Sequence, residues 1–339
     1  MILSISRRTD VPAFYTPWFM NRIKEGYVLA RNPVLYNRVS RIELNPETVD
    51  FMVFWTKNPT PMISYLKKIQ EVSPFYFQFT LNSYGPEIEP RVGSLESRIE
   101  AFQEIVEEFG TERLVWRYDP IFLSDIYTKD WHIEQFRKTA ERLWGCTESC
   151  VISFIDMYAG VKERTMPYGI RECTEQEMLE IASAFSEIAK ENDIQIESCA
   201  ESVNLRPYGI EHGSCIDARR ISRVLGKEIF VKKDSNQRTG CGCVVSVDIG
   251  QYNTCRHGCV YCYANRDSSV RNMPAHDATS PLLAGKLSGQ DIVAECKTCS
   301  IFKGVKGQLS MFDKDQESTT HHLAQGFEVG ACKEQALVD

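Results

Sequence analysis

The sequence has no uninterrupted apolar run of about 18 residues, the length that a helix needs to cross a membrane. We therefore expect no membrane span. Residues 1–8 enter a strand-like pattern directly and lack the charged, apolar and small-residue regions of a secretory signal. We expect a cytoplasmic protein whose 13 cysteines are reduced thiols or metal ligands rather than disulfides.

The sequence also lacks an excess of positively charged residues. Its 39 lysines and arginines are outnumbered by 46 aspartates and glutamates, which gives a net charge of −7. A protein that binds duplex DNA over a large surface usually has the opposite balance, so we expect no extensive nucleic-acid interface. No Gly-x-Gly-x-x-Gly sequence follows a predicted strand, which argues against a dinucleotide-binding Rossmann domain.

Predicted strands and helices alternate along the first 198 residues. Short β-branched or aromatic runs predict the strands, and amphipathic segments such as 94–109 and 178–189 predict helices between them. The predicted strands are residues 2–6, 51–55, 75–81, 114–117, 151–155 and 194–197. This alternation is typical of βαβ units around a parallel sheet, so the expected fold class is α/β.

Polar side chains follow nearly every one of these strands. They are Arg7, Arg8, Asp10, Lys57, Asn58, Asn82, Arg117, Asp119, Asp156 and Glu201. In parallel α/β barrels the carboxyl ends of the strands build the active site. A single polar residue often only begins a loop, but the repetition over five or six strands favours a common site.

Three cysteines are grouped on one short loop. Residues 244–249 predict a buried strand that ends at Gly250, and Cys255, Cys259 and Cys262 follow with the spacing C-x3-C-x2-C. An iron–sulfur cluster that only transfers electrons normally has four cysteine ligands, so a group of three indicates a cube with one open iron. Zinc is the alternative, although it prefers four tetrahedral ligands and regular C-x2-C pairs.

This loop resembles the cluster motif of the radical S-adenosylmethionine (SAM) enzymes. The sequence Y-C-Y-A at residues 261–264 is most similar to the branch that includes spore photoproduct lyase. In that branch the cluster strand comes first, followed by a Thr-Lys, a strand that faces the substrate, and a Glu-Pro with an Arg. Residues 56–57, 77–80 and 89–91 keep that order here. Only the cluster strand has moved, to the C-terminal side.

The resemblance covers roughly residues 1–265 and implies a partial or complete parallel (β/α) barrel of radical SAM type, circularly permuted with the cluster strand C-terminal. Such a permutation is tolerated where chain ends lie on the surface of a domain. The chain also resembles a family known only as a domain of unknown function. If residues 244–249 are the permuted first strand, their neighbour in the sheet should be residues 2–6, and residues 7–10 should end beside the cysteine loop.

The resemblance also implies the chemistry. A [4Fe–4S] cluster on the three loop cysteines would cleave SAM and generate a 5′-deoxyadenosyl radical that acts on an unidentified substrate, with a small molecule or peptide favoured. Flavodoxin or ferredoxin is implied as electron donor, and Tyr261 should contact the adenine. Ser4, Ser6 and Asp10 would offer acceptors to the SAM amino group. Candidates for the SAM carboxylate, its ribose or the substrate are Arg7, Arg8, Asp10, Lys57, Asn82 and Arg117.

Four further cysteines lie between the last predicted strand of the first half and the cluster strand. They are Cys199, Cys215, Cys241 and Cys243. Four thiolates complete the coordination of a second cube or of one zinc ion, with sulfurs about 4 to 7 Å apart. The alternative is that they are buried thiols that pack as small hydrophobic groups. We expect a second metal site, whereas the pair Cys296 and Cys299 is expected to bind nothing.

The chain thus divides into five expected segments. They are the barrel strands and helices (1–198), a cysteine-bearing segment (199–243), the cluster strand and loop (244–265), a C-terminal extension (266–312) and a polar, disordered tail (313–339). Three functions remain open at this stage. They are a radical SAM enzyme of unidentified substrate, a radical SAM lyase that repairs damaged nucleic acid, and a non-catalytic zinc- or iron–sulfur-binding protein.

Overall fold

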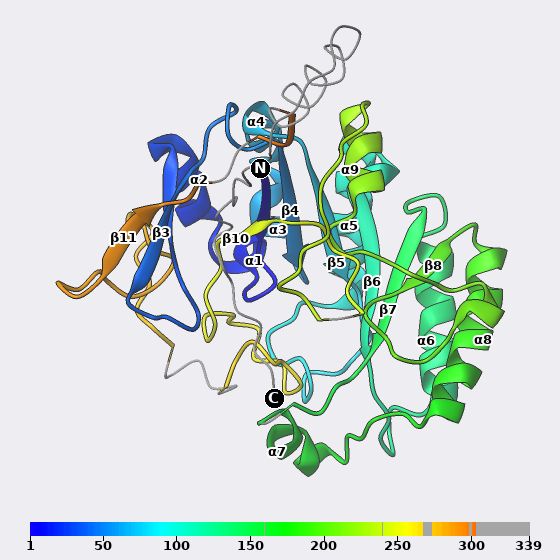
Figure 1. Ribbon diagram of the computed structural model, residues 1–339. Helices are drawn as coiled ribbons and strands as arrows, with labels where there is room; N and C mark the ends of the chain where they lie inside the picture. Colours follow the sequence, from blue (N-terminus) through cyan, green and yellow to red (C-terminus); the bar gives the residue numbers. More distant parts are fainter. Residues whose placement is uncertain (159, 239, 267–272, 298–299, 303–339) are drawn as a thin grey trace, which may run out of the picture.

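The computed structural model describes residues 1–158, 160–238, 240–266, 273–297 and 300–302. Within these residues the largest sheet has eight strands in the order β10–β1–β4–β5–β6–β7–β8–β9, and every neighbouring pair is parallel (Figure 1). The strands are β1 (Ile2–Ile5), β4 (Phe51–Thr56), β5 (Phe75–Thr80), β6 (Leu114–Ile121), β7 (Ser149–Phe154), β8 (Gln195–Ser198), β9 (Glu211–His212) and β10 (Val247–Asp248). Each of the six strands predicted in the first 198 residues is present, which confirms the α/β class.

The sheet is open along the part of the chain that the structure describes. Strands β9 and β10 are its two edges, and no ladder joins them. Each of these edge strands has only two residues, too few to continue the hydrogen-bonded ladder around a ring. The expectation of a complete barrel is therefore wrong.

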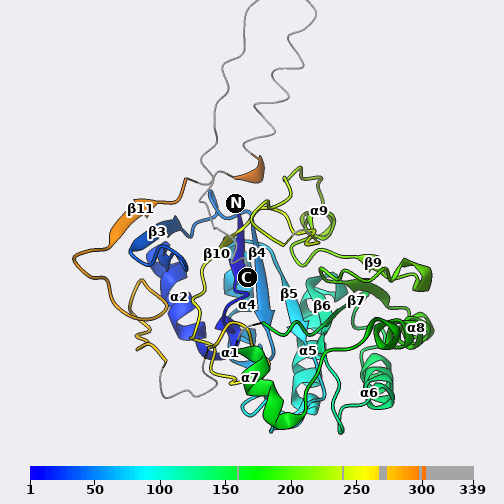
Figure 2. The same cartoon turned by 60° about the horizontal axis from the view of Figure 1, so that its bottom comes forward.

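Helices cover one face of this sheet. The described helices are α1 (Val11–Phe14), α2 (Thr16–Glu25), α3 (Thr60–Ile63), α4 (Leu66–Val72), α5 (Leu95–Phe109), α6 (Lys129–Arg142), α7 (Val161–Thr165), α8 (Glu175–Glu191) and α9 (Ala218–Leu225), with 3₁₀ turns η1 (Thr111–Arg113), η2 (Met166–Tyr168) and η3 (Arg206–Tyr208). Of these, α5, α6 and α8 lie along the same side of β5, β6 and β7 (Figure 2). Their apolar residues form one core with alternate strand residues such as Leu3, Phe54 and Trp116. None of the described helices has the length and apolarity needed to cross a membrane.

The opposite face, here called the inner face, carries the other set of alternating residues. Its apolar part includes Val53, Tyr76 and Val115. These side chains pack against residues of the segment 199–243, including those of α9. The Tyr76 hydroxyl and the Gln78 side-chain amide both donate to the Cys215 carbonyl, at 2.6 and 2.9 Å. A segment with little regular structure therefore takes the place that a layer of helices would occupy.

Strand β10 is the cluster strand predicted from residues 244–249, but it is shorter. Val244 forms an isolated antiparallel bridge with Lys233 and packs in the inner-face core, so it does not join the ladder. Strand β10 pairs in parallel with β1, with Leu3 opposite Val247 and Ser4 opposite Asp248. The predicted pairing of the C-terminal cluster strand with the first strand of the chain is thus confirmed.

The carboxylate of Asp248 ties this edge together. It accepts hydrogen bonds from the Ser4 and Ser6 hydroxyls at 2.6 and 2.5 Å and from the backbone N–H groups of Arg7 and Gly250 at 3.0 and 2.9 Å. Burial alone would raise the pKa of Asp248, but the arginines at positions 7 and 8 and the two hydroxyls outweigh burial and lower it. The group is therefore a buried carboxylate at neutral pH.

A second sheet, of three strands in the described residues, lies beside α2, on the left of Figure 1. Strand β2 (Tyr27–Arg31) is antiparallel to β3 (Arg38–Glu43), and β3 is parallel to β11 (Ile292–Glu295). The sequence reading missed this sheet. Strand β11 comes from the expected C-terminal extension, so part of that extension is ordered against the N-terminal half. The expected tail over residues 313–339 lies outside the described residues.

We predict that Asp248→Asn lowers the free energy of unfolding by about 1–3 kcal/mol at pH 7, because an amide cannot accept all four hydrogen bonds. The stabilisation by a carboxylate with a lowered pKa is complete above its unfolded value of about 3.9 and disappears as the pH falls through the folded value. The difference between wild type and variant should therefore shrink below about pH 4. Urea denaturation between pH 3 and pH 7 measures it. The matched control is Asp125→Asn, at an exposed position, and equal stability of the two variants would contradict the assignment.

Candidate metal and cofactor site

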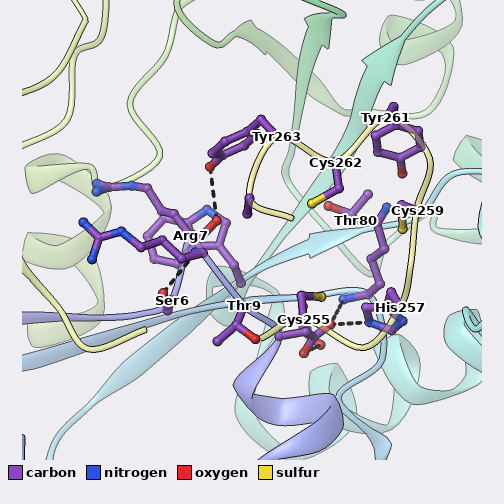
Figure 3. Close-up of a pocket in the computed structure, with 16 residues that line it drawn as sticks. Ser6, Arg7, Thr9, Thr80, Cys255, His257, Cys259, Tyr261, Cys262 and Tyr263 are labelled. Carbon is purple, nitrogen blue, oxygen red and sulfur yellow. Dashed lines mark hydrogen bonds and ion pairs between the residues drawn. The ribbon is translucent and has the colours of Figure 1, made fainter. Parts of the chain in front are cut away.

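A cavity of about 140 Å³ lies at the carboxyl ends of β1, β4 and β5, under the loop that follows β10. Residues 6–10 after β1, residues 55–57 at the end of β4, and Thr80 line one part of it. The loop supplies the rest, and Figure 3 shows its three cysteines around the same space. The expectation that residues 7–10 end beside the cysteine loop is confirmed.

The thiols of Cys255, Cys259 and Cys262 all line this cavity, and the described lining contains no fourth cysteine. Burial raises the pKa of Cys255 to about 12 and also raises the pKa of Cys259 and Cys262. These thiols are protonated at neutral pH unless a metal displaces their protons. Among the residues that the structure describes, no three Cys, His, Asp or Glu side chains are arranged around the position of a single ion.

Asp10 holds the floor of the cavity together. One carboxylate oxygen accepts from the Ala13 N–H at 2.9 Å, which caps α1, and from the Thr56 hydroxyl at 2.8 Å. The other accepts from the Lys57 N–H at 2.7 Å and lies 2.8 Å from Nε2 of His257 in the cysteine loop. Asp10 was expected to bind SAM, but both of its oxygens are occupied by the protein. Its place in this structure is that of a clamp between β1, β4 and the loop.

Two further contacts secure the cysteine loop. The Arg164 guanidinium, from α7, donates to the carbonyl of Val260 at 3.2 Å and to that of Cys262 at 2.6 Å. The Tyr15 hydroxyl donates to the Thr254 carbonyl at 2.5 Å. Sequence reasoning missed both side chains, because nothing in the sequence distinguishes an arginine on a helix that contacts a distant loop from one that faces solvent.

Lys57, Glu89 and Tyr261 form a buried group at the wall of the cavity. The Lys57 ammonium is 2.9 Å from the Glu89 carboxylate and 5.6 Å from the centre of the Tyr261 ring, and the Tyr261 hydroxyl donates to Glu89. Burial alone would lower the pKa of Lys57 and raise that of Glu89, but their mutual attraction outweighs it, so that the pKa of Lys57 is raised and that of Glu89 lowered. Both groups are charged at neutral pH. Tyr261 lines the cavity with its hydroxyl already bound to Glu89, and its contact with an adenine stays a prediction.

The other predicted cofactor residues fall into two groups. Arg7 and Arg8 line the cavity. Arg8 lies 3.8 Å from the Asp248 carboxylate and 5.2 Å from the Tyr252 ring centre. The remaining two residues are outside the described lining. Both polar atoms of the Asn82 side chain are bound to the backbone of Asp119, and Arg117 forms a two-point ion pair with the Asp119 carboxylate.

Thr9 is a cavity residue that sequence reasoning did not single out. Its hydroxyl is buried and has no hydrogen-bond partner within the protein, although it lies on the cavity lining. A buried hydroxyl without a partner is costly, so a polar ligand in the cavity would satisfy it. The expected acceptors Ser4 and Ser6 are both bound to Asp248 instead.

The second set of cysteines lies together on the inner face of the sheet, apart from the cavity. The sulfurs of Cys199 and Cys215 are 3.3 Å apart, and the thiol of Cys243 interacts with those of both Cys215 and Cys241. Cys215 and Cys243 belong to the inner-face core, against which the other two pack. The structure therefore links the four cysteines in a series, and the metal site expected there stays a prediction. Cys296 packs at the edge of the main core, whereas its expected partner Cys299 lies outside the described residues.

A family model described as "Domain of unknown function (DUF1848)" matches residues 2–264. The match includes both sets of cysteines and every strand of the large sheet. None of the curated proteins compared with the chain matches it.

We predict that Asp10→Ala lowers the free energy of unfolding of the metal-free protein by about 3 kcal/mol, because four buried donors lose their acceptor. Amide hydrogen exchange at Lys57 and Ala13 should accelerate, since both N–H groups bond to this carboxylate. Asp125→Ala is the matched control. An unchanged free energy of unfolding in the Asp10 variant would show that the carboxylate is not a structural clamp.

Proposed function

Because the chain belongs to the family described as Domain of unknown function (DUF1848), whose description assigns no activity, we propose its function from the site itself: a radical SAM enzyme that holds a [4Fe–4S] cluster on Cys255, Cys259 and Cys262. One observation carries the proposal. Three thiols spaced C-x3-C-x2-C line a single cavity at the carboxyl edge of a parallel sheet, and the described lining adds no fourth.

The position of β10 supports the permuted arrangement that belongs to this proposal. The strand that precedes the cysteine loop comes late in the chain, yet it pairs in parallel with β1. Strand β1 then leads into residues 6–10, which face the three thiols across the cavity. The site is therefore assembled as it would be if the cluster strand stood first in the chain.

When bound, the cluster would supply the electron that cleaves the S–C5′ bond of SAM, giving methionine and a 5′-deoxyadenosyl radical that abstracts hydrogen from the substrate. The protein contributes position and seclusion. Asp10 and Arg164 hold the cysteine loop against the ends of β1 and β4. Burial of Cys255 and Cys259 keeps water away from the ligands.

The charged and polar lining suits the amino-acid end of SAM. Lys57 and Arg8 are cations on the cavity wall, and a carboxylate is the group that they attract. The unpaired Thr9 hydroxyl is a polar partner for the same end of the ligand. The Tyr261 ring is an apolar surface of the kind on which an adenine packs.

We predict that anaerobically reconstituted protein binds about four irons and four sulfides at this site and converts SAM to 5′-deoxyadenosine when reduced with dithionite. Cys259→Ala should abolish this activity, because two ligands cannot hold the cube. The control is Cys146→Ala, a free cysteine outside both sets. Unchanged 5′-deoxyadenosine formation by the Cys259 variant would falsify the assignment. Zinc in place of iron in the purified wild type, with no cleavage after reconstitution, would favour a non-catalytic metal protein.

A second prediction concerns Thr9. Thr9→Val keeps the shape of the side chain and removes the hydroxyl, so SAM should bind about 3- to 10-fold more weakly to the reconstituted protein. Thr9→Ser retains the hydroxyl and should bind SAM as the wild type does. Equilibrium dialysis with labelled SAM measures both variants. Equal affinities of the valine and serine variants would show that the Thr9 hydroxyl does not contact SAM.

A further inference from the structure

The second set of cysteines is assembled from three separate parts of the chain. Cys199 directly follows β8, Cys215 precedes α9, and Cys241 and Cys243 precede β10. The 3.3 Å contact between the sulfurs of Cys199 and Cys215 begins a series that continues through Cys243 to Cys241. Buried thiols that only fill space have no reason to gather from three segments into one group.

Two N–H groups point at these sulfurs. The Arg117 guanidinium, from β6, donates to Sγ of Cys215 at 3.0 Å, and the backbone N–H of Ile216 donates to Sγ of Cys243 at 3.4 Å. A neutral thiol is a weak acceptor, whereas a thiolate accepts charge-assisted hydrogen bonds. The surroundings of Cys215 therefore suit a sulfur that carries negative charge.

A second cation, Arg7, lies in the same region. One terminal nitrogen of the Arg7 guanidinium is buried without a hydrogen-bond partner in the protein. Its charge interacts with Cys243, Asp248 and Cys215. A buried N–H without an acceptor is costly, and negatively charged sulfur nearby would offset that cost.

The segment that carries these cysteines has little regular secondary structure to hold it in place. Residues 199–243 contain only η3, the two-residue β9 and the eight-residue α9 within their described part, yet they cover the inner face of the sheet. Short irregular segments are commonly held by a closed metal site, because metal binding then contributes directly to the stability of the fold.

We propose that Cys199, Cys215, Cys241 and Cys243 form a second metal centre, a closed site of four thiolates that fastens residues 199–243 to the inner face of the sheet. Its occupant is a thiophilic metal, either one zinc ion or a second iron–sulfur cube. Binding displaces the thiol protons and involves no redox step. Because the four sulfurs now lie in a series rather than around one point, they move apart when the metal enters.

The test uses full-length protein in which the first site has been removed by Cys255→Ala, Cys259→Ala and Cys262→Ala together, so that failure of the proposed function leaves the outcome unaffected. After anaerobic purification, iron, sulfide and zinc are counted. We expect either one zinc or about four irons with four sulfides per chain, which also distinguishes the two occupants. A protein without metal, in which Cys199 and Cys215 are joined by a disulfide or remain free, would overturn the proposal.

Two further measurements locate the metal. Adding Cys215→Ser should release it, whereas adding Cys146→Ala should not. If the Cys215 variant does not fold, the triple variant is alkylated with iodoacetamide and analysed by peptide mass spectrometry. All four cysteines of the second set should resist alkylation until a chelator or mercurial is added. The control, Cys146, should react at the same rate before and after that addition. Metal that persists with Cys215 alkylated would place it elsewhere and contradict the proposal.

Discussion

The contact on which the functional face depends is the buried carboxylate of Asp248 between the last strand of the large sheet and the first. Strand β10 has two residues and therefore little ladder of its own, so the hydrogen bonds from Ser4, Ser6 and the following backbone hold it in register with β1. The loop after β10 and the loop after β1 then meet at one edge. Without that pairing, the three cysteines and residues 6–10 would not share a cavity.

The two faces of the sheet are stabilised in different ways. Helices bury the outer set of strand residues in a large apolar core, which requires only amphipathic sequence and needs no specific partner. The inner face becomes polar toward the carboxyl edge, where Gln78 and Arg117 point at a segment with few hydrogen-bonded elements. On this face, specific polar contacts stabilise the packing in place of buried apolar surface. In our proposal a bound metal contributes as well. This difference explains why chemistry-bearing residues collect on one side of the molecule.

The candidate residues fall into three groups according to what surrounds their side chains. Asp10 accepts hydrogen bonds from two backbone N–H groups, Thr56 and His257, and Asn82 is bound to the backbone of Asp119. Arg117 lies at the second group of cysteines rather than at the first. Lys57, Arg8 and Tyr261 do line the cavity, and Thr9 joins them. A polar residue at a strand end thus marks the functional edge of the sheet. Its role depends on which groups the fold places within hydrogen-bonding distance of its side chain.

The sequence by itself determined the local features: alternating strands and helices, the spacing of the three loop cysteines, and the order of segments that implied a displaced cluster strand. Each of these depends on residues close together in the chain, where apolar periodicity and ligand spacing are directly readable. Only the tertiary structure decided that the sheet stays open, that β2, β3 and β11 form a second sheet, and that Arg164 and Thr9 belong to the site. These features arise from contacts between residues distant in sequence, and a carboxylate such as Asp10 is bound by whichever donors the fold brings within reach.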